Sequence, residues 1–147
     1  MKTVKGNLIH LAKAGEFDVI LHGCNCFNSW GAGIAVEIRK AFPRAYRADM
    51  QTEKGDKTKL GTFTFAYIER FNLTVINCYT QYKYGRGLQA DYKAIEAVLQ
   101  KVALAYPNAK VGLPKIGAGL AGGDWGVISQ LIDKHLSDVV YVEYDNS

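Results

Sequence analysis

The amino-acid sequence predicts an α/β fold, a three-layer α/β/α sandwich with a mixed central sheet. Segments with the pattern of a strand alternate along the chain with segments that have the pattern of a helix. Residues 17–21 include Val, Ile and Leu in succession, as in a strand that helices cover on both faces. Residues 63–67 alternate bulky and small side chains and lead through a turn into the apolar residues 73–78. This pattern predicts an antiparallel hairpin, which makes the sheet mixed.

The segment after the first strand has the spacing of a helix. Its apolar residues recur every four positions: Ile34, Ile38 and Phe42. Pro43 marks a break, and a second, more polar helix is expected around residues 46–53. The charged residues 53–59 are expected to form a loop, and Asn72 is expected in the turn of the hairpin.

The second half of the chain continues the alternation of helices and strands. Residues 91–105 predict an amphipathic helix, with Asp91 placed to cap its first turn. Residues 111–113 predict a buried strand, which ends at Pro114 because proline cannot donate to a sheet ladder. Apolar residues at helical spacing then indicate a last helix, and residues 139–144 predict a terminal strand.

The composition is that of one soluble globular unit. At 147 residues and 48% apolar composition, the chain can build one hydrophobic core, so residues 1–147 are expected to form a single, monomeric domain. The apolar stretches are much shorter than the roughly 20 residues that cross a bilayer, so we expect no membrane partner. The three cysteines are an odd and sparse set, which favours a reduced, cytoplasmic protein.

The charge balance is mildly basic. A net charge of +4 favours an anionic ligand. Lys and Arg do not reach the clustered density of a nucleic-acid-binding domain, so the charge gives no strong indication of a nucleic-acid partner. Charge alone does not identify the ligand.

Two glycine-rich loops follow predicted strands, at residues 31–33 and 117–123. Ligands of α/β sheets bind beyond the carboxyl ends of the strands, so we expect the two loops to form the walls of one cleft. Glycine lets backbone N–H groups approach a phosphate, and each loop runs into a helix N-terminus, where negative charge is favoured. Together the loops predict a diphosphate site, although a tight turn explains either loop alone equally well. Neither loop has the P-loop or the dinucleotide-binding pattern.

Two longer motifs resemble the signature loops of macrodomains, a family that binds ADP-ribose. The motifs read HGCNCFNSWGAGIA at residues 22–35 and LPKIGAGL at residues 113–120. The first is most similar to the branch that contains the ADP-ribose 1''-phosphate phosphatases of fungi and related phage proteins. The second motif continues with AGGDW at residues 121–125, and it also resembles macrodomains that remove ADP-ribose from proteins or DNA. The resemblance covers essentially the whole chain and implies the macrodomain fold.

The resemblance implies a set of ligand-binding residues for an ADP-ribose derivative. The two loops would hold the diphosphate through Gly31, Ala32, Gly33, Ile34, Gly117, Ala118, Gly119, Leu120, Ala121 and Gly122. Asn25 matches the asparagine that holds the distal ribose, with Asn28 as the substitute, and a turn or cap role is the alternative. Asn7 stands where the family usually has an Asp that accepts from the adenine amino group. Tyr144 matches an aromatic residue near adenine, although a core position explains it equally well.

Two residues are candidates for catalysis. His22 ends a buried strand at the mouth of the predicted cleft, and imidazole titrates near neutral pH. The alternative is a histidine that orients the loop. Asp124 is placed to position water or act as a base, with a helix N-cap as the alternative. Lys83 or Arg86, in the loop after residues 73–78, is placed to attract a terminal phosphate, although a solvated surface loop explains these residues equally well.

The sequence departs from the branch that removes ADP-ribose from macromolecules. Ala121 stands where that branch has its catalytic Asp, and residues 77–81 lack its catalytic Lys. The first hypothesis is therefore an enzyme that removes the 1''-phosphate from ADP-ribose 1''-phosphate. The alternatives are a hydrolase of ADP-ribosylated macromolecules or O-acetyl-ADP-ribose, and a reader that binds ADP-ribose without turnover. His22, Cys24 and Cys26 are too few for a zinc site, so neither a metal nor a cofactor is expected.

Overall fold

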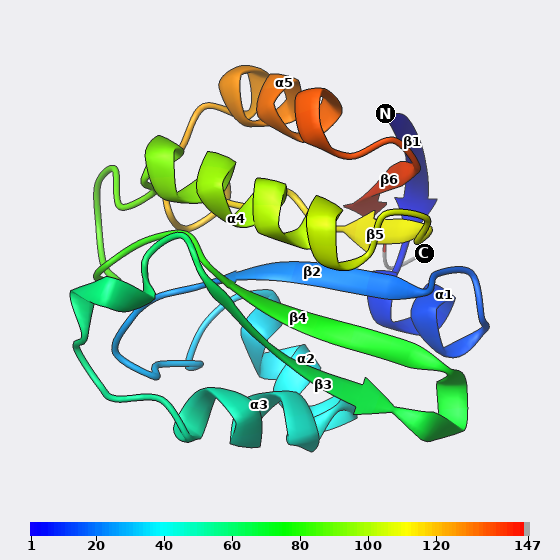
Figure 1. The fold of residues 1–147 in the computed structure, drawn as a ribbon, viewed down its shortest axis with the longest axis horizontal. Coiled ribbons are helices and arrows are strands. Elements are labelled where there is room, and N and C mark those ends of the chain that lie inside the picture. Colours follow the sequence, from blue (N-terminus) through cyan, green and yellow to red (C-terminus); the bar gives the residue numbers. More distant parts are fainter. Residues whose placement is uncertain (146–147) are drawn as a thin grey trace.

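The computed structural model describes residues 1–145, and its strands form one six-stranded sheet between helices (Figure 1). The strand order across the sheet is β1-β6-β5-β2-β4-β3. Neighbouring strands are parallel except β3 and β4, which pair antiparallel as a hairpin. The predicted mixed sheet is confirmed. The strands are β1 (Lys2–Gly6), β2 (Val19–Cys24), β3 (Phe63–Ile68), β4 (Leu73–Tyr79), β5 (Val111–Leu113) and β6 (Val139–Tyr144).

Helices cover both faces of the sheet, which confirms the predicted three-layer α/β/α sandwich. Helices α4 and α5 pack on one face, and α1, α2 and α3 pack on the other (Figure 1). Within residues 1–145, no helix is long and apolar enough to cross a membrane. The helices are α1 (Leu8–Lys13), α2 (Ile34–Ala41), α3 (Pro43–Met50), α4 (Tyr92–Ala105) and α5 (Trp125–His135), with short 3-10 turns η1 (Lys57–Lys59) and η2 (Glu69–Phe71).

Strand β2 lies near the centre of the sheet, and helices bury both of its faces. Val19 and Leu21 pack in the cluster under α4 and α5, whereas Ile20 packs in the cluster under α1, α2 and α3. These three side chains are almost completely inaccessible to water, and burial of each stabilises the fold by about 1.5–3 kcal/mol. Because successive side chains of a strand alternate between faces, His22 lies on the same face as Ile20.

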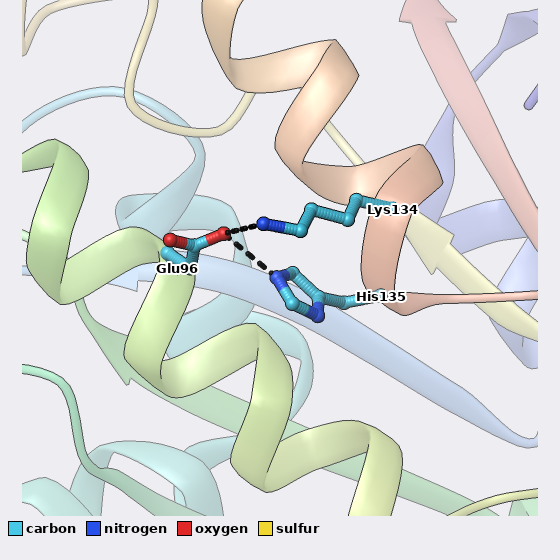
Figure 2. A network of polar contacts seen from close by, with 3 residues as sticks. All are labelled: Glu96, Lys134 and His135. Atoms are coloured by element: carbon cyan, nitrogen blue, oxygen red, sulfur yellow. Dashed lines mark hydrogen bonds and ion pairs between the residues drawn. The ribbon is translucent and has the colours of Figure 1, made fainter.

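A polar contact joins α4 and α5, which cover the face of the sheet opposite to His22. Glu96 of α4 accepts hydrogen bonds from Nε2 of His135 at 2.9 Å and from Nζ of Lys134 at 3.1 Å, both on α5 (Figure 2). His135 is the last residue of α5, and the helix dipole stabilises a positive charge at this C-terminal end. The contact ties α5 to α4.

Several elements differ in their bounds from the prediction. The strand predicted at residues 17–21 is β2, which spans Val19–Cys24. The polar helix predicted at residues 46–53 is α3, which spans Pro43–Met50. Pro43 occupies the first turn of α3, where its missing N–H has no helical partner in any case.

Two elements at the amino terminus are additional to the predicted ones. β1 is an edge strand parallel to β6, with three exposed residues and two that are half-buried. Lysines on such an edge oppose pairing with other chains. Helix α1 has only six residues. Neither element has the long periodic pattern that identifies a helix or a buried strand.

Candidate functional site

A cavity of about 740 Å³ opens between two glycine-rich loops at the carboxyl ends of β2 and β5. The first glycine loop is residues 31–33, before α2, and the second glycine loop is residues 117–123, before α5. Because residues of both loops line this one cavity, the predicted meeting of the loops is confirmed. A cavity of this size suits a ligand of several hundred daltons.

Two glycines of these loops occupy positions where a side chain would be strained or obstructed. Gly33 has φ +64°, and a Cβ added there would lie 3.2 Å from Cδ1 of Leu120 in the opposite loop. A Cβ added at Gly123 would lie only 2.5 Å from the carbonyl oxygen of Gly117, within the second loop. Glycine is therefore required at these two positions by conformation or by space.

The N-terminus of α2 faces the cavity without a side-chain cap. Its N-cap residue is Gly33, and no side chain accepts from its first amides. Gly33, Ile34 and Ala35 all line the cavity. The first N–H groups of a helix have no partner within the helix, and the helix dipole favours negative charge there. This end of α2 therefore offers unpaired backbone donors to an anion.

The cavity contains most, but not all, of the residues predicted to bind a ligand. The predicted residues that line it are Asn25, Gly31, Ala32, Gly33, Ile34, Gly117, Gly119, Leu120 and Ala121. The predicted residues that do not line it are Asn7, His22, Asn28, Ala118, Gly122, Asp124 and Tyr144.

Asn25 and Asn28 have different roles in the loop after β2. The side-chain oxygen of Asn25 accepts from the backbone N of Phe27 at 2.9 Å, and its Nδ2 donates to the carbonyl of Ser29 at 3.0 Å. Asn25 thus closes a turn while it lines the cavity. Asn28 adopts a left-handed conformation with φ +57°, and its Nδ2 donates to the carbonyl of Asp49 at 2.8 Å. Asn28 anchors the loop to α3 and is no substitute for Asn25 in the cavity.

His22 does not lie at the mouth of the cleft, so that prediction is wrong. The imidazole is fully buried beneath α1, α2 and α3, and it does not line the cavity. Desolvation lowers the pKa of His22 to about 4, although a hydrogen bond to Asn77 acts in the opposite direction. Because the imidazole is fully buried and does not line the cavity, it has no direct contact through which to exchange a proton with a ligand there. Strand alternation explains the placement, because it turns His22 away from α4 and α5.

The hydrogen bonds of Asn77 determine the tautomer of His22. Nδ2 of Asn77 donates to the carbonyl of Ala45 at 2.9 Å and to Oγ1 of Thr64 at 3.0 Å. The amide oxygen therefore faces His22, whose Nε2 donates to it at 2.7 Å. Nδ1 is left as an acceptor, and Sγ of Cys24 lies 3.9 Å from Nδ1 and 3.7 Å from Nε2. His22 thus links β4 to Cys24, which lines the cavity.

Asp124 is the N-cap of α5, the role predicted as the alternative to catalysis. Its Oδ1 accepts from the backbone N of Gly126 at 2.8 Å and of Val127 at 3.4 Å. The residue is exposed and does not line the cavity. Its carboxylate is committed to the helix terminus, so the predicted role as a base beside the ligand is not supported by its position.

Asn7 and Tyr144 lie together at the carboxyl ends of β1 and β6. Asn7 caps α1, since its Oδ1 accepts from the backbone N of His10 at 3.1 Å. Tyr144 pairs in register with Gly6 and is 70% exposed, so the core position considered as its alternative is excluded. Both residues therefore lie at the same end of the sheet, and neither lines the cavity.

The cavity has two charged lining residues among residues 1–145, Arg86 and Lys115, and no carboxylate lines it. Arg86 is one of the two cations predicted to attract a phosphate, whereas Lys115 was not assigned from the sequence. Trp30 forms part of the wall and is held by the buried carboxylate of Asp49. Trp30 lies inside the first motif, which could have indicated it. Asp49 had no such signal, because it occurs in a helix that reads as polar and exposed.

The thiol on the cavity wall is held in its neutral form. Burial raises the pKa of Cys24 well above its ordinary value, and the negative charge of Asp49 contributes in the same direction. A neutral thiol is a weak nucleophile. Cys24 therefore contributes shape rather than reactivity to the cavity.

Comparisons of sequence relate the chain to a family and to several curated proteins. The family model of the Macro domain matches residues 21–132. The chain is 33% identical to the "Uncharacterized 17.5 kDa protein in tk-vs intergenic region" of Enterobacteria phage T4, over 99% of this chain and 97% of that protein. It is 29% identical to the ADP-ribose 1''-phosphate phosphatase of Candida albicans, over 83% of this chain and 85% of that protein.

Comparisons of structure show the same fold in solved proteins. A Bacteroides thetaiotaomicron protein of unknown function superposes with a TM-score of 0.77 and 27% identity, covering 97% of this chain and 96% of that one. The macrodomain of Mycobacterium tuberculosis DarG shares the fold, with a TM-score of 0.78 at 21% identity over 99% of this chain and 97% of that one. With the family model spanning both glycine loops, the chain belongs to the Macro domain family.

Proposed function

We propose that the protein binds ADP-ribose 1''-phosphate in the cavity between the two glycine loops and removes its terminal phosphate by hydrolysis. The observation that carries the proposal is the uncapped N-terminus of α2, which opens into a cavity with cationic but no anionic lining residues within the described chain. Such a surface suits a diphosphate. The activity is that of similar proteins, since relatives from Candida albicans and Lodderomyces elongisporus are named ADP-ribose 1''-phosphate phosphatase.

The order of the strands gives the ligand a direction in this proposal. The diphosphate would lie between the two glycine loops, and the distal ribose would contact Asn25 at the end of β2. Adenine would extend toward β6 and β1, where Asn7 and the exposed ring of Tyr144 lie. An aromatic ring at that edge can pack against a base.

The proposed reaction depends on charge stabilisation. Water attacks the terminal phosphorus, the P–O bond to the ribose breaks, one proton of the water passes to the ribose oxygen, and inorganic phosphate and ADP-ribose leave. Negative charge is held by preorganised N–H groups at α2 and by the cations Arg86 and Lys115. Because His22 and Asp124 are held elsewhere, catalysis is assigned to positioning and electrostatics rather than to a side-chain base.

The test is phosphate release from ADP-ribose 1''-phosphate by the purified protein, with a matched pair of variants at Gly31. Gly31 lines the cavity, and an added Cβ meets nothing within 4 Å, so both a carboxylate and an amide fit there. Gly31→Glu should reduce phosphate release at least about tenfold relative to Gly31→Gln, because only the carboxylate repels the diphosphate. Equal rates for the two variants would place the reaction elsewhere.

A reader that binds ADP-ribose without turnover is the second candidate. It is favoured by one observation: no imidazole or carboxylate among residues 1–145 lines the cavity. ADP-ribose binding without phosphate release would support the reader. If ADP-ribose binds and the protein instead releases it from a modified macromolecule or from O-acetyl-ADP-ribose, the cavity stands but the proposed substrate is replaced.

A further inference from the structure

Residues 82–89 form a strap that joins the two sides of the cavity. At one end, the carbonyl of Tyr82 accepts from the backbone N of Cys26 at 2.9 Å. At the other end, the backbone N of Gln89 donates to the carbonyl of Ala121 at 2.8 Å. A bridge between Gln81 and Ala90 closes the base of the strap. The strap is therefore tied both to the loop after β2 and to the second glycine loop.

Arg86 lies on the part of the strap that lines the cavity. Its carbonyl accepts from Nε2 of Gln89 at 2.9 Å, which fixes the backbone at this point. No carboxylate within residues 1–145 forms an ion pair with its guanidinium. Lys83, the other cation of the strap, lines a separate cavity with Tyr82 and Asp91. The structure thus distinguishes the two cations that sequence reasoning left as alternatives.

The strap begins at one end of the cavity and crosses to the second glycine loop, with Arg86 between its two attachments. The strap follows β4, which lies on the opposite side of β2 from β5 and β6. Lys115, the second cation of the lining, follows β5 and belongs to the other side. In the ligand direction proposed above, adenine lies toward β6, so the end near β4 receives the distal ribose and its 1'' substituent.

We infer that Arg86 is the specificity-determining residue that binds the terminal phosphate and distinguishes ADP-ribose 1''-phosphate from ADP-ribose. The inference rests on the proposed function. A phosphate monoester carries close to two negative charges at neutral pH, and a guanidinium can donate two parallel hydrogen bonds to it. ADP-ribose has only a hydroxyl at this position, so it gains little from Arg86.

The experiment compares two ligands across wild type, Arg86→Gln, Arg86→Lys and the control Lys83→Gln. The dissociation constant for ADP-ribose is measured by calorimetry. ADP-ribose 1''-phosphate is followed by kcat/KM for phosphate release, or by its dissociation constant if no phosphate is released. Arg86→Gln should lower kcat/KM or affinity for the phosphorylated ligand about tenfold or more, with less than about a twofold change for ADP-ribose. Arg86→Lys should recover part of the loss, and Lys83→Gln should match wild type.

Two results would overturn the inference. An equal effect of Arg86→Gln on both ligands would mean that Arg86 acts on the shared diphosphate or on the shape of the strap. An effect on neither ligand would mean that Arg86 stays in solvent. Provided that wild type binds ADP-ribose, neither result contradicts the proposed binding cavity. If wild type binds neither ligand, the proposed function itself fails, and the inference fails with it.

Discussion

The indole N–H of Trp30 donates to the carboxylate of Asp49 at 2.7 Å, and both residues are buried. Trp30 lines the cavity directly before the first glycine loop, whereas Asp49 belongs to the last turn of α3. The other oxygen of Asp49 accepts from the hydroxyl of Tyr79 at 2.6 Å. A carboxylate without direct access to the cavity thus fixes part of its wall.

Asp49→Ala is predicted to weaken both the fold and the site. Alanine leaves the indole N–H of Trp30 and the hydroxyl of Tyr79 without their acceptor, which costs about 1–3 kcal/mol. The free energy of unfolding should fall by this amount, and the affinity for ADP-ribose should fall severalfold because Trp30 is released. Urea denaturation and calorimetry measure the two effects.

Tyr79→Phe is the matched control for Asp49→Ala. It removes the hydrogen bond to the other carboxylate oxygen and leaves Trp30 bonded. The variant should lose stability and keep its affinity for ADP-ribose. If Tyr79→Phe reduces affinity as much as Asp49→Ala does, the Trp30 bond has no special part in the site.

Acid should destabilise the protein through His22. Its pKa falls from about 6.5 to about 4 on folding, because burial disfavours the charged form. The unfolded chain binds the proton first as pH falls, so this contribution is complete above pH 6.5 and is lost between pH 6.5 and 4. The loss is about 2 kcal/mol between pH 7 and 5. Urea denaturation of wild type and His22→Gln at both pH values should show a smaller pH effect in the variant, and parallel pH curves would contradict this.

The contact in Figure 2 predicts a second acid effect, at lower pH. Hydrogen bonds from His135 and then Lys134 hold the pKa of Glu96 below its ordinary value. Its contribution to stability is therefore present above pH 4.5 and is lost as pH falls through the lowered pKa. Glu96→Gln should lower Tm more at pH 7 than at pH 3. Glu37→Gln breaks an exposed 3.9 Å pair with Lys40 and serves as control, with no change of Tm at pH 7.

Two glycines of the second glycine loop should respond differently to an added methyl group. In Gly123→Ala the Cβ would lie 2.5 Å from the carbonyl oxygen of Gly117, so the backbone must move. This should reduce the free energy of unfolding by about 1–3 kcal/mol. In Gly119→Ala the Cβ meets nothing within 4 Å, and the change should stay within about 0.5 kcal/mol. Equal losses in urea denaturation would show that the loop adopts another conformation.

Sequence patterns predicted the elements whose burial is periodic and local. β2 and β5 are apolar runs, α4 has a buried stripe with Asp91 as its cap, and the β3–β4 hairpin alternates. β1 escaped prediction because an edge strand with two lysines buries too little to produce a pattern. The positions of the two glycine loops followed directly from the strand ends.

The roles of single polar residues were harder to predict than the backbone. The predicted strand ends at residue 21, which places His22 at the cleft, whereas β2 extends to Cys24 and keeps His22 inside the sheet. Asp124 satisfies both an N-cap and a catalytic pattern, and only its hydrogen bonds to Gly126 and Val127 decide between them. The partnership of Trp30 and Asp49 joins residues 19 positions apart through tertiary packing, for which the sequence has no local signal.

The central claim is that ADP-ribose binds in the cavity between the two glycine loops, and an NMR titration of the 15N-labelled wild-type protein tests it most directly. The backbone amides of Gly33, Ile34 and Ala35, and those of the second glycine loop, should shift progressively and saturate as ADP-ribose is added. The amides around Glu96 and His135, on the face covered by α4 and α5, should stay unchanged. Saturating shifts that leave out the N-terminus of α2, or no shifts at millimolar ADP-ribose, would contradict the claim.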